Sequence, residues 1–208
     1  MMKKLILMFG GLLLSLGNYA ISPGSNDGNG SHADLCISPN PVNSISGNAN
    51  SSINLHLDKS DINFDFSTFD DYKNGVGGYN VDAYSTKGAI LSAVNWKFSV
   101  RALASFTSSD GFSTILLNNV GFTVQFDGDV DVVNYTLNGP KALSANEVVL
   151  LEKRSLDQSK GNEKNNKFVV FWEMGTKKGN MNQLGILDQN IKGGSYSTQV
   201  EFVALESL

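Results

Sequence analysis

The chain has 208 residues and a formal net charge of −4, and only 17% of its residues are charged. Its 16 Lys and Arg residues stand against 20 acidic residues, which excludes a basic nucleic-acid-binding protein. The single Cys excludes a miniprotein held together by disulfides, and the 12 Phe exclude a chain that is disordered throughout.

The first twenty residues have the layout of a secretory signal peptide. Lys3 and Lys4 precede an apolar run over 5–14, and small and polar residues follow as far as Ala20. A short membrane anchor is the alternative, but the run is well below the roughly twenty residues that a bilayer requires. We therefore expect an exported protein, periplasmic, extracellular or at the cell surface, with no membrane span after signal removal.

Residues 21–50 differ in composition from the rest of the chain. Nineteen of these thirty residues are Gly, Ser, Asn or Pro, and such a segment buries too little apolar surface to offset its ordering entropy. We expect a flexible leader, with an arm that becomes ordered on another subunit as the alternative. Cys36 lies in this leader, and we expect a free thiol there rather than an intermolecular bridge.

From Ser51 onward, apolar and polar residues alternate with a period of two, which predicts strands separated by Gly, Asn and Asp turns. Residues 168–172 are continuously apolar, as in a strand buried on both faces. Residues 144–147 match a helix-capping box by spacing, but the segment that follows suits a strand equally well. A single sheet cannot cover so many apolar faces, so we predict an all-β, two-sheet antiparallel β-sandwich, Ig-like or pilin-like, over 51–208. The alternating segments are 53–57, 62–66, 96–102, 115–117, 120–126, 133–137 and 200–202.

Residues able to form an enzyme's active site are scarce. His32 lies in the leader, and His56 is expected on the polar side of a strand. The chain has no Gly-x-Ser-x-Gly motif. A zinc site needs three or four Cys or His ligands, and one Cys and two His are all that the chain offers, so we expect no zinc site. Nothing in the pattern pairs two carboxylates for glycoside cleavage. We therefore predict a protein that is not an enzyme; the acids considered were Glu147, Glu152, Glu173 and Glu201.

One segment has the spacing of a metal site. Asp127, Asp129 and Asp131 alternate, and alternate Asp oxygens can converge on Ca²⁺ where the backbone turns sharply. Val132 and Asn138 stand where an EF-hand has Gly and Glu. We interpret the segment as a link between strands with exposed acids, with a Ca²⁺ site as the alternative, and we expect no other cofactor.

The aromatic residues divide into two groups. Trp96 and Trp172 lie in strongly apolar strands and are expected in the core. Tyr72, Tyr79 and Tyr84 lie in a Gly-rich loop region. They are either ordinary turn residues or the aromatic platform of a site for a carbohydrate or another ligand.

Several segments resemble exported bacterial surface proteins. These are Ile62–Phe66, residues 71–75 and 95–100, and the closing run 194–205 with Gly, Tyr196 and an alternating strand. The resemblance is to the fimbrial-like, spore-coat-U-like and WxL-like β-sandwiches, although the single Cys departs from the disulfide usual in fimbrial subunits. It implies a protein that is assembled on or displayed from the cell surface and has no enzymatic site.

The sequence thus predicts a secreted or cell-surface structural or adhesive subunit whose partners are further copies of itself or other surface proteins. An open sheet edge and a donated strand provide the physical route for such assembly. Ser51–Leu57 follows the leader directly and is the donor strand that we expect. The alternative is an extracellular β-sandwich module that binds a carbohydrate or another ligand through the three tyrosines.

Overall fold

The computed structural model describes residues 33–41, 45–47, 51–59, 61–128, 133–134, 139–153 and 161–207. All of them belong to one compact unit, residues 31–208. The predicted signal peptide, 1–20, lies outside the described residues, as do 21–32, 42–44 and 48–50 of the predicted leader.

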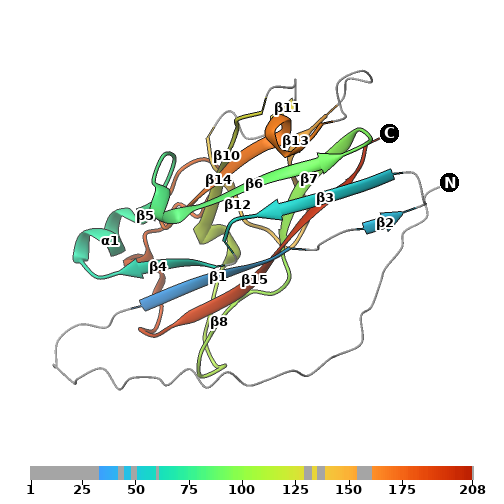
Figure 1. The fold of residues 1–208 in the computed structure, drawn as a ribbon. Helices are drawn as coiled ribbons and strands as arrows, with labels where there is room; N and C mark the ends of the chain where they lie inside the picture. The colour runs from blue at the N-terminus through green and yellow to red at the C-terminus, as the bar shows by residue number, and fades with distance from the viewer. Residues whose placement is uncertain are drawn as a thin grey trace. The chain divides into compact units, whose positions relative to one another are not determined.

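The described strands form two sheets that pack face to face (Figure 1), so the predicted all-β two-sheet sandwich is confirmed. The first sheet has the order β11-β13-β7-β15-β1-β4, with β8 and β9 attached beside β15. Its strands are β1 (Ala33–Pro41), β4 (Ile62–Phe66), β7 (Trp96–Ala102), β8 (Phe106–Ser108), β9 (Thr114–Ile115), β11 (Val133–Asn134), β13 (Val148–Glu152) and β15 (Tyr196–Glu206).

The second sheet has the order β12-β10-β14-β6-β3-β2, with β5 attached to β14. Its strands are β2 (Ile45–Gly47), β3 (Ser51–Leu57), β5 (Val76–Gly77), β6 (Ser85–Ser92), β10 (Val120–Phe126), β12 (Lys141–Ala142) and β14 (Lys167–Met174). The short helices are α1 (Phe69–Asn74), η1 (Asp82–Tyr84), η2 (Leu117–Asn119), η3 (Glu163–Asn166) and η4 (Ile186–Gln189).

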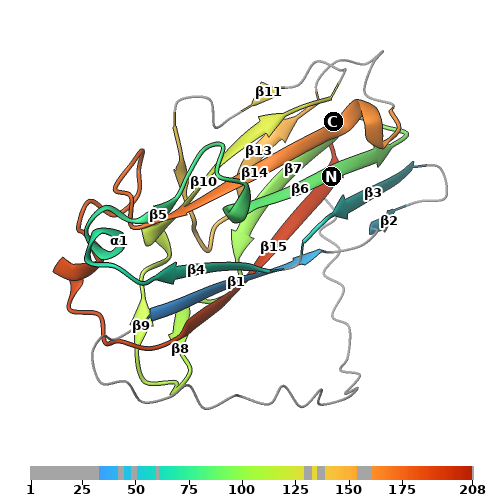
Figure 2. The ribbon, with the colours of Figure 1, turned by 60° about the vertical axis from the view of Figure 1, so that its left-hand side comes forward.

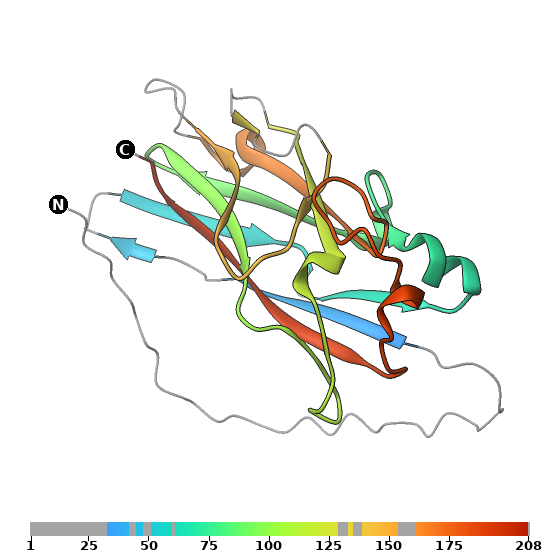
Figure 3. The same cartoon turned by 180° about the vertical axis from the view of Figure 1, so that it is seen from behind.

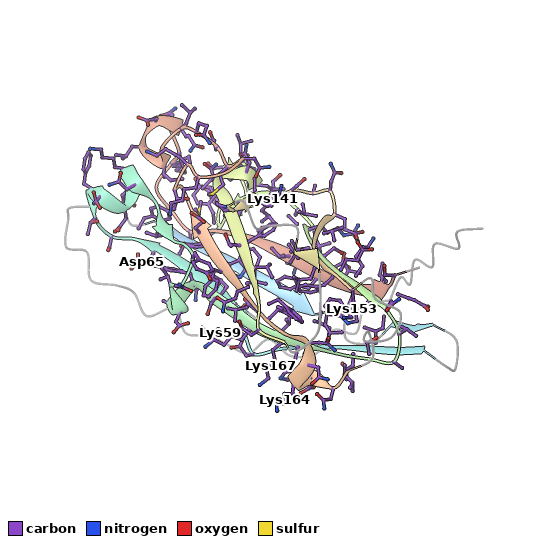
Figure 4. All side chains as sticks on the ribbon, turned by 90° about the horizontal axis from the view of Figure 1, so that it is seen from above. Lys59, Asp65, Lys141, Lys153, Lys164 and Lys167 are labelled. Carbon is purple, nitrogen blue, oxygen red and sulfur yellow. The ribbon has the colours of Figure 1, made fainter. Side chains whose placement is uncertain are left out.

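Aromatic rings from both sheets meet in the core. The ring of Phe98 on β7 lies 4.4 Å from that of Phe168 on β14, and the rings of Trp172 and Phe202 are 6.0 Å apart. Trp96 and Trp172 are both fully buried, which confirms their expected place in the core. Figure 4 shows the side chains that fill the space between the sheets, with Lys164 and Lys167 on the outside.

Three further predictions from the sequence concern β14, His56 and the segment before β13. β14 is buried at every position after Lys167, as its apolar run predicts, and His56 is exposed on β3. The open question at 144–147 is answered against a helix: these residues form a bend, and the apolar run that follows them is the strand β13. The β-branched Val148 and Val149 suit that strand, which pairs with β7.

The predicted boundary between leader and sandwich at residue 51 differs from the structure. Residues 33–41 form β1 within the first sheet, and 45–47 form β2 at the edge of the second. The alternation of Ala33, Leu35 and Ile37 is the signal for β1, and the surrounding Gly, Ser, Asn and Pro obscured it. Part of the predicted leader is therefore a strand of the sandwich.

No helix in the described ranges is long and apolar enough to cross a membrane.

Candidate functional site

The most distinctive feature of the fold is the position of β1, which lies between β4 and β15 (Figure 2). It pairs parallel to β15, whereas the other strand pairings in the described part of the chain are antiparallel. The first described strand thus lies directly beside the last strand of the chain. We call the space between β4 and β15 the β1 slot.

The register aligns β1 with buried positions on both sides. Leu35 is opposite Phe64 on β4 and Tyr196 on β15, and both of these partners are fully or almost fully buried. Ile37 is likewise opposite the buried Ile62 and Thr198. The β1 slot therefore runs alongside the hydrophobic core, and the strand that fills it completes the first sheet.

β1 pairs with β4 over a shorter length than with β15. Its pairing with β4 ends at Ile37, whereas its pairing with β15 continues to Pro41, opposite Phe202. Pro39 and Pro41 thus lie where β1 has a partner on one side. Proline has no N–H to donate, so it is tolerated in such an edge-like segment and not where both neighbours require hydrogen bonds.

One pairing within the β1 slot joins two residues of like charge. Asp34 is directly opposite Asp65, which is exposed on β4 and is marked in Figure 4. Like charges at directly opposite positions of an antiparallel pair destabilise that pair. From this register we expect a weaker attachment of β1 to β4, which are paired at five positions.

β4 is also held by contacts that do not involve β1. Tyr84 stacks on Phe64 with 5.3 Å between the ring centroids, and Tyr72 packs on Phe66 at 5.4 Å. Burial, followed by the nearby charges of Asp65 and Asp71, raises the pKa of Tyr84 above its usual value. These contacts attach one side of the β1 slot to the body independently of the strand within it.

The segment after β4 reinforces this attachment. A capping box starts α1: the Thr68 hydroxyl accepts from the backbone N–H of Asp71, and the Asp71 carboxylate accepts from that of Thr68. β5 then pairs with β14. At Gly77, with φ of 82°, a Cβ atom would lie 2.4 Å from the carbonyl oxygen of Trp172, so this close approach requires glycine.

The three tyrosines of the predicted platform do not share one surface. Tyr72 and Tyr84 are partly buried against β4, whereas Tyr79 is 56% exposed and packs on Phe171 of the second sheet at 5.1 Å. The Tyr79 hydroxyl donates to Oε1 of Gln125 at 3.1 Å. Tyr79 is therefore the candidate among the three for contact with an external ligand.

The predicted Ca²⁺ segment is only partly described, because Asp129 and Asp131 lie outside the described residues. Asp127 is exposed, and its carboxylate accepts a hydrogen bond of 2.6 Å from the side chain of Gln125. Within the described ranges, no group of three or more His, Cys, Asp or Glu side chains lies close enough to hold a metal ion.

The four glutamates considered for catalysis contact different groups. Glu173 is buried, accepts a hydrogen bond from the Thr176 hydroxyl and lies 3.7 Å from Nζ of Lys178. The other three contact side chains elsewhere in the fold: Glu147 with Lys97, Glu152 with Ser207, and Glu201 with Arg101.

No protein-family model matches the chain, and none of the curated proteins compared with it matches.

Proposed function

We propose that this protein is an exported, non-enzymatic structural or adhesive subunit of the cell surface that assembles by strand addition. The observation that most directly supports this proposal is the β1 slot, filled by a strand close to the N-terminus that pairs parallel to the C-terminal strand. β1 of one copy would enter the β1 slot of the next. The resemblance to fimbrial-like surface sandwiches supports the same function.

β1, rather than the predicted donor Ser51–Leu57, is the strand that we propose to exchange. Ser51–Leu57 is β3, which pairs with β6 on one side and with β2 on the other. β1 precedes every other described strand, so an exchange moves the start of the chain and leaves the sequence from β3 onward in its own fold. The opposed Asp34 and Asp65 favour its release.

The ring contacts on β4 support the other half of this mechanism. A β1 slot without its strand presents unpaired backbone groups on β4 and β15, which is the template for strand addition. Phe64 and Phe66 remain packed on Tyr84 and Tyr72, so β4 stays attached to the body while the slot is empty. Each copy donates one strand and accepts another, and such head-to-tail contacts build open chains unless the rotation between copies closes a ring.

A disulfide between β1 and β4 tests the exchange. Cys36 is directly opposite the exposed Asn63. Opposite positions of an antiparallel pair have Cα atoms about 4.5–5.5 Å apart, within the range that a disulfide spans. The variant Asn63→Cys, when oxidised, holds β1 in its own slot. We expect the wild type to form a ladder of oligomers in light scattering and electron microscopy, and the oxidised variant to form no ladder.

Two controls accompany this experiment. Reduction of the Asn63→Cys variant restores the ladder, and Asn63→Ser keeps it under oxidising conditions. A wild-type protein that forms no ladder at high concentration overturns the proposal. A ladder formed equally by the oxidised variant also overturns it, because assembly then does not require β1 to leave its slot.

Binding of a glycan is the second function that we propose, and Tyr79 is the observation that favours it. An exposed ring beside the polar side chains of Gln125 and Asp127 provides a face for a sugar ring and hydrogen-bonding groups for its hydroxyls. On a glycan array, Tyr79→Ala should lose binding, and Tyr79→Phe should keep the contribution of the ring. Equal binding by wild type and Tyr79→Ala excludes this site.

A further inference from the structure

β2 follows β1 closely in the sequence but belongs to the other sheet. Only residues 42–44 separate Pro41, the last residue of β1, from Ile45, the first residue of β2. β1 lies in the first sheet, and β2 is the edge strand of the second sheet, where it pairs with β3. The view from behind shows β2 in light blue beside β3 in cyan (Figure 3). The chain therefore passes from one sheet to the other within three residues.

The length of this connection limits where β2 can go when β1 leaves its slot. From Pro41 to Ile45 there are four Cα–Cα steps, which span roughly 14 Å when the chain is fully extended. Two packed sheets lie about 10 Å apart, so crossing from one to the other uses most of this reach. Once β1 is seated in the slot of another copy, β2 is confined to the second sheet of that copy.

β2 is also held by few contacts in its own copy. It is paired with β3 at three positions, whereas β1 is paired at seven positions with β15 and at five with β4. A short pairing of two strands is only marginally stable by itself. We therefore expect β2 to leave together with β1.

The departure of β2 leaves a matching acceptor edge on every copy. β3 stays paired with β6 at positions 53–57, and Ile53 packs against the core, so β3 remains in place. Its other edge then presents the unpaired backbone groups of positions 51–53, to which β2 was paired. The β2 of a neighbouring copy meets this edge in the same register, because the β1 that precedes it fixes its position.

We propose that the site for strand addition has two parts, the β1 slot in the first sheet and the edge of β3 in the second. The occupant is residues 33–47 of another copy of this chain, with β1 in the slot and β2 paired to β3. This inference rests on the proposed assembly by strand addition and extends it to the second sheet. The chain then crosses between copies after Gly47, and the part that stays in its own fold begins at Ser51.

A pair of cysteines across β2 and β3 tests this assignment. Ser46 is directly opposite Ser52, and opposite positions of an antiparallel pair are close enough for a disulfide. Cys36→Ser serves as the background, so that the introduced cysteines are the only ones in the chain. In this background, the double variant Ser46→Cys, Ser52→Cys is assembled while reduced and is then oxidised. The product is separated on a denaturing gel without reductant.

We expect covalent multimers on this gel, because each disulfide joins position 46 of one copy to position 52 of the next. The same variant oxidised before assembly should form no ladder, since its β2 is then fixed to its own β3, and reduction should restore the ladder. The matched controls, Ser46→Cys alone and Ser52→Cys alone, lack the opposite thiol and should run as single chains from an intact ladder.

Disulfides confined to single chains within an intact ladder overturn the proposal, as does the absence of any disulfide there, because β2 is then not donated. A ladder formed equally well by the variant oxidised before assembly also overturns it. Should circular dichroism show that the serine pair disturbs the fold, Ile45→Cys with Ile53→Cys repeats the measurement at the next paired position. A Cys36→Ser protein that forms no ladder contradicts strand addition itself, so the two proposals fail in distinguishable ways.

Discussion

β14 and β1 are both interior strands of their sheets, yet they are attached in different ways. β14 lies between β10 and β6, pairs antiparallel with both, and is buried at every position after Lys167. β1 lies between β15 and β4, pairs parallel with β15, and contains two prolines and an aspartate opposite another aspartate. The comparison teaches that an interior position in a sheet does not by itself make a strand firmly attached.

The largest expected loss of stability comes from a substitution in β14. Trp172 is fully buried, contacts Phe122 and Phe202, and donates from its ring nitrogen to the Thr86 hydroxyl at 3.1 Å. Trp172→Ala should lower the free energy of unfolding by about 3–5 kcal/mol, since it leaves a large cavity in the core. Urea denaturation measures this loss. The exposed Phe69→Ala should change stability by less than about 0.5 kcal/mol, and an equal loss in both contradicts the assignment of the core.

Hydrogen exchange compares the two strands within one molecule. We expect the amides of β1 and β4 to exchange at least about tenfold faster than those of β14, because local openings require less free energy than global unfolding. The ring contacts of Tyr84 and Tyr72 should keep β4 better protected than β1. Uniform protection of β1, β4 and β14 would show that β1 opens only when the whole domain unfolds.

Removing the opposed charge should strengthen the attachment of β1. Asp65→Asn removes the repulsion between residues 34 and 65, and we expect a gain of roughly 0.2–1 kcal/mol in the stability of this pairing. Slower hydrogen exchange in β1 and slower growth of the oligomer ladder measure it. Glu163→Gln removes the same charge from the exposed surface of η3 and should leave both rates unchanged. Equal rates in wild type and Asp65→Asn contradict this role of the charge pair.

The smallest expected effect is on the pKa of Tyr84. This pKa is raised in the folded protein by burial first and then by Asp65 and Asp71. The folded state therefore holds the proton more tightly than the unfolded state. Its contribution to stability is fully present below about pH 10 and is lost as the pH rises through the folded pKa.

An absorbance titration measures this pKa, with Tyr84→Phe to identify the signal. Asp65→Asn should lower the pKa only part of the way towards its usual value, because burial is the larger cause. A return to the usual value in Asp65→Asn would show that charge, rather than packing on Phe64, determines the pKa of Tyr84.

The exposure of the predicted functional residues was harder to predict from the sequence than the strands were. The pattern of the sequence singled out three tyrosines because they are aromatic and near glycines, but burial depends on what packs against each ring. Phe64 and Phe66 partly cover Tyr84 and Tyr72, and Tyr79 alone of the three is mostly exposed. The sequence around Phe112 does not predict its exposure, because phenylalanine is usually buried and nothing in the neighbouring residues indicates a side chain that is 91% exposed.

The sequence by itself determined the all-β class, the two-sheet packing and the burial of Trp96 and Trp172, because an alternation of two places side chains on opposite faces of a strand. Only the tertiary structure decided that β1 belongs to the sandwich, that it lies parallel to β15, and which tyrosines are covered. The physical reason is that strand partners and ring contacts join residues far apart along the chain. A local pattern predicts which face of a strand is buried, but it does not predict which strand lies beside it.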